Sequence, residues 1–205
     1  MKKLFFIMFA MMPLTLWAQD NTWELNEDDV KQEVKTKAKV EAKYLKGAVP
    51  VVDGHVVFST SIEAPGKTAS QIYDIILQYM EALTKVSNQL DSKVITTDAA
   101  KHEIIGSYQE WLVFKNSTLS LDRTRFFYIL DAQCSDGRAD IKMMRLRYLY
   151  EEERDPSHYR AEEWITDEEA VNKKNTKLLP ISGKFRRKTI DRKDYLFNKF
   201  ASLLK

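Results

Sequence analysis

The stretch TASQIYDIILQYMEALTKV, residues 68–86, decides the fold. Its apolar side chains recur every three or four residues and therefore share one face of a helix; they are Ile72, Ile75, Ile76, Tyr79, Leu83 and Val86. Thr68 and Gln71 have the spacing of a capping box, in which each side chain accepts a hydrogen bond from the other residue's backbone amide. The pattern predicts an amphipathic helix from Thr68 to about Asn88.

The segment after this helix predicts an antiparallel meander, because apolar runs are separated by turn-forming residues. The expected strands are Lys93–Thr97, His102–Phe114, Thr118–Gln133, Arg138–Tyr150 and Tyr159–Ile165. In the fourth strand one face is expected to carry Met144, Leu146, Tyr148 and Tyr150, and the other Met143, Arg145, Arg147 and Leu149. One buried face and one largely solvated face are typical of an antiparallel sheet.

A hairpin is expected before the helix, with Asp53-Gly54 joining the strands Val49–Val52 and His55–Ile62. Asp-Gly favours a two-residue type I′ turn, because both positions of that turn need a positive φ. Pro50 places the first strand at an edge, since proline cannot donate a hydrogen bond to a sheet.

The C-terminal part predicts two further helices. A short one begins at Thr166, with Glu169 as its capping-box partner. A basic loop, Lys173–Lys188, follows, and the last helix begins at Asp191. The order strand, long helix, four or five strands, helix predicts a two-layer α+β domain, β-α-β4-α, in which two main helices cover one face of an antiparallel sheet.

Residues 1–18 have the pattern of a secretory signal peptide, in which Lys2 and Lys3 precede an apolar run that ends at Ala18. Cleavage after Ala18 is expected. The alternative is a membrane anchor, but a spanning helix needs about 20 apolar residues and this run is shorter. No cysteine follows Ala18 directly, so a lipoprotein is not expected, and the protein is predicted to be periplasmic or secreted without a membrane anchor.

Signal cleavage would change the charge balance of the chain. The sequence has 32 basic and 30 acidic residues, and residues 1–18 contain two of the basic and none of the acidic ones. A mature chain of net charge near zero has no global attraction to nucleic acid or anionic lipid. Cys134 is the single cysteine, so no internal disulfide can form, and we expect it to be a packing residue.

Residues 19–43 form a charged lead, which is acidic up to Asp29 and lysine-rich after it. Its low apolar content favours a flexible tail. Docking of Trp23 on the domain or on a partner is the alternative. A single domain is expected over residues 44–205.

Three stretches resemble an uncharacterised family of secreted Bacteroidota proteins. They are YLKGAVPVVDGHVVF at 44–58, IEAPGK at 62–67 leading into Ile72-Tyr73, and GKFRRKTID at 183–191. The family is described as a domain of unknown function with a TATA-binding-protein-like (TBP-like) fold, and the resemblance spans about residues 44–205. It implies a β-α-β4-α arrangement and no particular catalytic or binding residue. The fold does not imply DNA binding, because function depends on the site.

The sequence contains no recognisable catalytic motif. His55, His102 and His158 are far apart and lack the spacing of paired metal ligands. Phosphate-binding loops, dinucleotide-binding glycine patterns and nucleophile elbows are absent from the sequence. No metal and no cofactor are predicted, and a Ser/His/Asp arrangement assembled from distant residues stays open.

Charge is segregated in the last third of the chain. Glu151–Glu169 is acidic and Lys173–Lys193 is basic. One interpretation is a pair of solvated faces that partly neutralise each other. The other is an anion-binding patch, since arginine pairs suit bidentate capture of phosphate or carboxylate; its candidate residues are Lys184, Arg186, Arg187 and Lys188. Both can hold if Arg186 or Arg187 secures the helix end while its neighbour faces solvent.

Aromatic residues favour a binding or interaction module. Phe126 and Tyr128 alternate with Phe127 and Ile129, so one strand is expected to be apolar on both faces. An exposed aromatic face would be an interaction surface. The open sheet face, or a groove between helix and sheet, would then hold an unknown protein or a small apolar or glycan ligand.

Two other functions compete with this hypothesis. A small acid–base hydrolase or isomerase needs inward-pointing carboxylates in a helix-covered cavity, for which Asp131, Glu103 and Glu110 are the strand-borne candidates. Nucleic-acid binding is suggested by the fold name and the Lys184–Lys188 cluster, but a neutral exported chain argues against it. The oligomeric state is not predicted.

Overall fold

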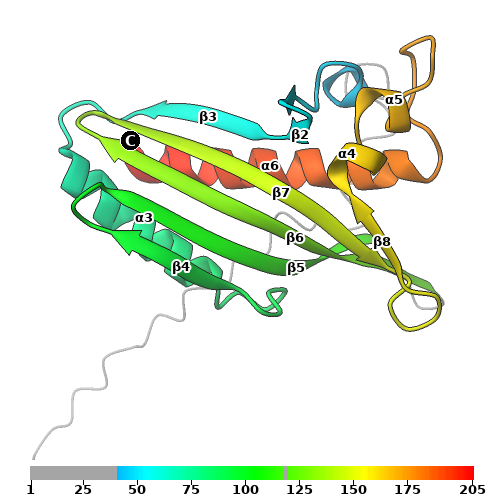
Figure 1. Ribbon diagram of the computed structural model, residues 1–205, viewed down its shortest axis with the longest axis horizontal. Helices are drawn as coiled ribbons and strands as arrows, with labels where there is room; N and C mark the ends of the chain where they lie inside the picture. The colour runs from blue at the N-terminus through cyan, green and yellow to red at the C-terminus, as the bar shows by residue number, and fades with distance from the viewer. Residues whose placement is uncertain (1–40, 118–119) are drawn as a thin grey trace, which may run out of the picture.

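A computed structural model describes residues 41–117 and 120–205, and it shows an antiparallel sheet with helices on one face (Figure 1). The spatial order of the strands is β3-β7-β6-β5-β4, and β8 pairs with β7. The strands are β3 (Phe58–Glu63), β4 (Lys93–Asp98), β5 (Glu103–Ser117), β6 (Ser120–Ser135), β7 (Arg138–Tyr150) and β8 (Ser157–Arg160). Helices α3 (Ala69–Leu83) and α6 (Ser182–Leu204) pack against the sheet and against each other. The predicted α+β class is confirmed.

Helix α3 begins as the sequence predicts. Thr68 caps it, and both hydrogen bonds of the capping box with Gln71 are formed. The helix ends at Leu83, five residues before the expected end. The following segment is held by strand β5 instead, because the Leu90 amide donates to the Gln109 carbonyl at 2.7 Å and the Trp111 amide donates to the Asn88 carbonyl at 3.2 Å.

Strand β7 changes face in the middle, where a simple alternation was predicted. Arg145 has a φ of +55°. The pairing with β6 shifts there, so that Phe127 lies opposite Arg147 and Ile129 opposite Met144. This is a β-bulge, in which one extra residue reverses the direction of the side chains that follow. The prediction that Met144 shares a face with Leu146 and Tyr148 is therefore wrong: Met143 is the buried residue, and Met144 is half-exposed on the other side.

Helix α6 begins at Ser182, nine residues before the predicted start at Asp191. Residues 182–188, expected to belong to a basic loop, form its first turns. The sequence contains no start signal here, because Ile181 at the N-cap position makes no side-chain capping hydrogen bond. The earlier start places Phe185 and Arg186 on the buried side of the helix.

The Asp53-Gly54 turn is confirmed, since φ is +50° at Asp53 and +79° at Gly54. The hairpin is short, however, with β1 (Val51–Val52) pairing only with β2 (His55–Val56). The chain leaves this hairpin at Val57, and β3 joins the main sheet by pairing with β7.

The segment between β7 and α6 is less extended than predicted. The strand expected over residues 159–165 stops at Arg160, where helix α4 (Ala161–Trp164) begins. Helix α5 (Asp167–Ala170) starts beside Thr166, as expected, but the Thr166 side chain makes no capping hydrogen bond. The predicted capping box at that position is wrong.

The described part of the chain opens with the short 3-10 helix η1 (Glu41–Tyr44). The predicted signal peptide of residues 1–18 and most of the charged lead of residues 19–43 lie outside the described residues. Within residues 41–117 and 120–205, no helix is long and apolar enough to span a membrane.

Candidate functional site

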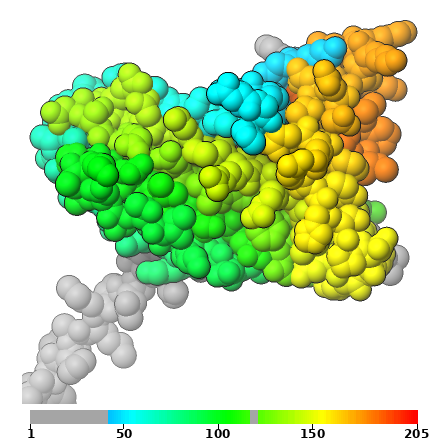
Figure 2. Space-filling view, viewed as in Figure 1, coloured from blue at the N-terminus to red at the C-terminus, as the bar shows by residue number. Residues whose placement is uncertain are grey.

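The side of the sheet that faces away from α3 and α6, here called the open face, carries a second set of apolar side chains. Successive residues of a strand point to opposite faces, so residues between core positions point outward. Seven apolar residues lie there: Ile105, Trp111, Val113, Phe127, Ile129, Met144 and Leu149. All seven are half-exposed, and none belongs to the core cluster. In Figure 2 strands β5 to β7 (green to lime) form this broad surface, with the loop after β7 (yellow) at its margin.

The open face also carries charged side chains of both signs. Its basic residues on β6 and β7 are Arg123, Arg125, Arg138, Lys142, Arg145 and Arg147, and the acidic Asp131 and Asp140 of the same strands also point outward. The guanidinium carbon of Arg123 lies 3.8 Å from the centre of the Trp111 ring, and that of Arg147 lies 5.5 Å from the centre of the Phe127 ring. A cation over a ring contributes about 0.5–1 kcal/mol at an exposed site. These arginines therefore have preferred positions above the apolar surface.

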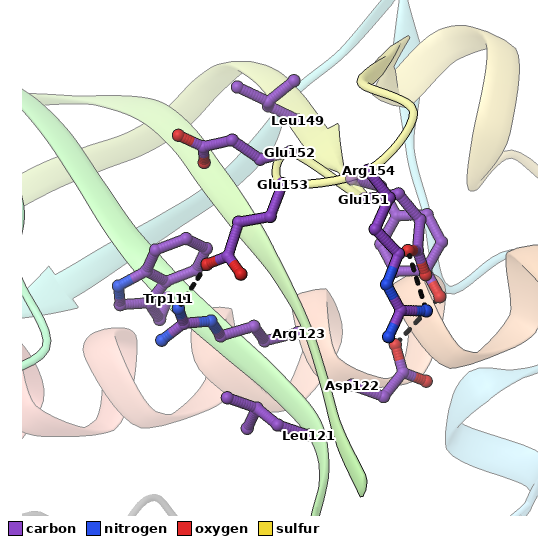
Figure 3. A pocket seen from close by; sticks show the side chains of 10 residues that line it. Trp111, Leu121, Asp122, Arg123, Leu149, Glu151, Glu152, Glu153 and Arg154 are labelled. Atoms are coloured by element: carbon purple, nitrogen blue, oxygen red, sulfur yellow. Dashed lines mark hydrogen bonds and ion pairs between the residues drawn. The ribbon is translucent and has the colours of Figure 1, made fainter.

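A hollow of about 490 Å³ lies at one end of the open face, where the ends of β5 and β6 approach the loop after β7 (Figure 3). Its lining residues are Trp111, Leu121, Asp122, Arg123, Leu149, Tyr150, Glu151, Glu152, Glu153 and Arg154. The acidic residues of the loop pair with the face: Arg125 Nε donates to Glu152 Oε2 at 2.9 Å, and a second guanidinium nitrogen of Arg125 contacts the same carboxylate. Arg123 pairs with Glu153 at 3.4 Å. The loop thus neutralises Arg123 and Arg125.

Arg186, one of the four predicted anion-binding residues, is fully buried and holds the protein together. Its Nε donates to the Tyr44 carbonyl at 2.6 Å, and its terminal nitrogens donate to the carbonyls of Ile165 and Leu45 and to Asp167 Oδ1 at 2.5–2.7 Å. Burial lowers the pKa of this guanidinium. Four of its five N–H groups are bound to protein oxygens and the side chain has no exposed surface, so Arg186 is not accessible to an anion from solvent.

The other three predicted residues do not converge on one point. Lys184 donates to Asp122 Oδ2 at 2.7 Å and to the Tyr150 hydroxyl at 2.9 Å. Burial opposes its charge, but these two hydrogen bonds raise its pKa. Arg187 lies over the Tyr44 ring at 4.4 Å, and Lys188 is half-exposed one position further along α6. Anion binding at Arg187 and Lys188 stays a prediction.

Glu110, a candidate for acid–base catalysis, points into the core and forms a buried ion pair. It is fully buried, and Arg192 of α6 is 1% exposed. The pair is bidentate, with Arg192 Nε and a terminal nitrogen each donating to one carboxylate oxygen at 2.7 Å. The side-chain amides of Asn88 and Gln89 also donate to Oε2, at 3.2 and 2.6 Å. Such a pair links helix to sheet and leaves Glu110 no free oxygen for a substrate.

The other two candidate carboxylates lie outside the core. Asp131 is on the open face, opposite Ile105 on one side and Lys142 on the other. Burial raises the pKa of its carboxyl group, and its Oδ1 has no hydrogen-bond partner among the described residues. Glu103 accepts a hydrogen bond from Gln133 Nε2 at 2.6 Å near the end of the sheet. The three carboxylates are therefore distributed over two faces.

The histidines and the cysteine occupy separate positions. His55 and His158 are exposed, and His102 Nε2 lies 3.0 Å from the Ser70 hydroxyl. Cys134 is buried, and burial raises the pKa of its thiol to about 11, as expected for a packing residue. In the described ranges no group of three His, Cys, Asp or Glu side chains could hold a metal ion.

A β-α-β4-α sheet-and-helix domain of this kind has a TBP-like fold. The chain belongs to the family described as "Domain of unknown function (DUF4468) with TBP-like fold", whose signature matches residues 58–149. A DUF4468 family protein from Bacteroides ovatus ATCC 8483 is 42% identical, with a TM-score of 0.74, over 79% of this chain and 93% of that one. The resemblance noted in the sequence is confirmed.

A more distant similarity shows the fold alone. A TBP-like protein from Parabacteroides distasonis ATCC 8503 is 20% identical, with a TM-score of 0.63, over 76% of this chain and 96% of that one. Among curated proteins, none matches this chain.

The sequence predicted the apolar side chains of the open face better than its charged ones. Phe126 and Tyr128 are buried, while Phe127 and Ile129 are half-exposed, as the alternation predicts. Arg145 and Arg147 were expected on the solvated face of their strand, but anion binding was assigned to the denser basic cluster after Lys173. Arg123 and Arg125 have the same period of two, which places both on one strand face.

Proposed function

We propose that this domain is a binding module that holds a partner on its open face. The observation that carries the proposal is the set of seven half-exposed apolar side chains on β5, β6 and β7, which lie on the side of the sheet without helices. Apolar surface of this extent is unfavourable in water and is typical of an interaction site. The predicted signal peptide supports a place of action in the periplasm or outside the cell.

The open face is favoured over a groove between helices and sheet. The space between the two layers is occupied by core side chains, among them Tyr108, Tyr128 and Phe200. The Tyr108 and Tyr128 rings stack with their centres 5.3 Å apart, and the Tyr108 hydroxyl donates to the Met80 carbonyl at 2.9 Å. A ligand that entered between the layers would have to displace these contacts.

The proposal is tested by changing the apolar centre of the face. Phe127→Thr with Ile129→Thr removes apolar area while keeping residues suited to a strand. The matched control is Leu179→Thr with Ile181→Thr, two exposed apolar residues of the loop before α6. Tagged full-length proteins are used to capture partners from cells that express the protein naturally, and the captured molecules are quantified.

We expect a defined set of molecules that wild type and the control retain and the open-face variant loses. Circular dichroism establishes that both variants are folded. Equal capture by all three proteins would overturn the proposal.

A further inference from the structure

We infer that the open face binds an acidic segment of a partner polypeptide that also carries apolar side chains; this inference rests on the proposed binding function. It starts from Arg145 and Arg147 on β7, here called the cationic strip; Lys142, further along the strand, lies opposite Asp131 of β6. Between the described residues, no ion pair within 4.0 Å involves Arg145 or Arg147. Arg145 and Arg147 are exposed.

The neighbouring arginines show which groups this face accepts. Arg125 and Arg123 hold Glu152 and Glu153, carboxylates of a polypeptide loop that lies over the end of the face beside Trp111. Planar guanidinium groups bind carboxylates in two-point contacts with strong directionality. The cationic strip presents the same chemistry further along the sheet, without such a loop.

The pairing of β7 with β8 adds a reason for an anion at this place. Arg147 lies directly opposite Arg160. Like charges in directly opposed positions destabilise a sheet. The charge of Arg160 is compensated by Glu163, whose Oε1 accepts a hydrogen bond from Arg160 Nε at 3.1 Å. A partner carboxylate near Arg147 would relieve the other half of this repulsion.

The apolar surface beside the strip requires an amphipathic partner. Phe127 lies opposite Arg147, and Ile129 lies opposite Met144 further along the same two strands. A small anion would leave this surface exposed to water, whereas a polypeptide can cover it with its own apolar side chains. Its acidic residues would then reach the arginines at the margin.

The same rings argue against a nucleic acid on this face. Single-stranded nucleic acid gains most of its sequence-tolerant affinity from bases stacked on aromatic rings. Here the guanidinium carbon of Arg123 lies 3.8 Å from the centre of the Trp111 ring and that of Arg147 lies 5.5 Å from the centre of the Phe127 ring, so each ring already has a cation beside it. The remaining apolar residues are mostly aliphatic and offer no stacking surface.

The test measures binding of a defined probe to the full-length chain by fluorescence anisotropy. The probe is a fluorescein-labelled peptide in which glutamate alternates with leucine and tryptophan. A control peptide has glutamine in place of each glutamate. Unlabelled oligodeoxynucleotide and vesicles containing phosphatidylglycerol serve as competitors. We expect the acidic peptide to bind at least about tenfold more tightly than the glutamine peptide, and added salt to weaken it.

Three pairs of substitutions locate the interaction. Arg145→Gln with Arg147→Gln should lower the affinity for the acidic peptide by roughly three- to tenfold, which is the effect expected from losing two exposed ion pairs. Glu152→Gln with Glu153→Gln should raise the affinity for the acidic peptide by roughly two- to fivefold, because Arg125 and Arg123 are then free to bind it. Lys173→Gln with Lys174→Gln removes the same charge from an exposed loop elsewhere and should change binding by less than about twofold.

The inference is overturned if the two peptides bind equally, if the Arg145/Arg147 variant binds as wild type does, or if the oligonucleotide or the vesicles displace the peptide preferentially. Failure of the broader proposal is distinguishable from these results. If the Phe127/Ile129 variant still loses captured molecules while the acidic peptide does not bind, the open face is a binding site for a partner of different chemistry.

Discussion

Arg186 and Arg192 lie six residues apart on α6, and both are removed from water. Arg186 donates to three backbone carbonyls and to Asp167, and Arg192 donates to both carboxylate oxygens of Glu110. A guanidinium group loses much solvation on burial and is tolerated only with such partners. The charge of these residues was visible in the sequence, but their partners are far away in it. Glu110 is 82 residues from Arg192, and Tyr44 is 142 residues from Arg186, so the sequence did not show that the two arginines are buried.

The Glu110–Arg192 pair gives a prediction at this scale. Arg192→Met should lower the free energy of unfolding by about 3–5 kcal/mol, because it leaves a buried carboxylate without its cation. Glu110→Met should cost a similar amount, and the double variant should cost clearly less than the sum, since no unpaired charge remains. Urea unfolding of the four proteins measures the coupling. Additive effects would contradict a direct ion pair.

At the scale of elements, the sequence predicted what depends on local patterns. The start of α3 at its Thr68 cap, the Asp53-Gly54 turn and the full length of β7 were correct. The β7 bulge was missed because Arg145 adopts a positive φ without being glycine or asparagine. For the candidate site this error matters most, since the bulge decides which methionine faces outward.

Helix α6 shows a second limit, because its first turn is defined by a loop and not by a cap. Gly183 lies against Leu178, and a Cβ at position 183 would come within 2.7 Å of the Leu178 Cβ. Leu178, in the loop before the helix, therefore lies so close to the backbone of Gly183 that a side chain at position 183 would clash with it. Such a contact between two segments leaves no periodic signal in the sequence.

Gly183→Ala tests this close approach. Alanine favours a helix by about 1 kcal/mol over glycine, yet we expect a net loss of about 1–2 kcal/mol, because overpacking at this contact costs more. Leu178→Gly removes the opposing Cβ, and in that background Gly183→Ala should be neutral or stabilising. Thermal or urea unfolding measures both. A stabilising effect of Gly183→Ala in the wild-type background would disprove the contact.

At the scale of the whole molecule, contacts between distant parts of the chain close the domain. Tyr44 donates from its hydroxyl to Asp191 Oδ1 at 2.7 Å, and Arg186 binds the carbonyls of Tyr44 and Leu45. The Gly47 amide donates to Asp167 Oδ2 at 2.8 Å. The stretches 44–58 and 183–191, which carry the family resemblance, thus touch each other in the fold. Their similarity was visible in the sequence, but their contact required the structure.

Arg186→Lys should loosen this closure without unfolding the sheet. Lysine keeps the charge but cannot reproduce the planar set of donors. Hydrogen exchange at the Gly47 and Ala48 amides should accelerate by about ten- to hundredfold, the loss expected for charged hydrogen bonds. Amides in the centre of β6 should be unaffected. Arg187→Lys, which changes only the residue stacked on Tyr44, is the control. Equal acceleration throughout the sheet would indicate global destabilisation instead.

The position of α6 after all the strands in chain order has a consequence for the timing of folding. Phe185, Ile190, Leu196, Phe200 and Leu204 fill one half of the layer that covers the sheet. A nascent chain lacks them until α6 has been synthesised, after every strand, and the sheet keeps much of its inner apolar face uncovered until then. We expect the ribosome-bound chain to remain without a stable domain until α6 has emerged. The order of the elements thus delays folding of the sheet until its covering helix is made.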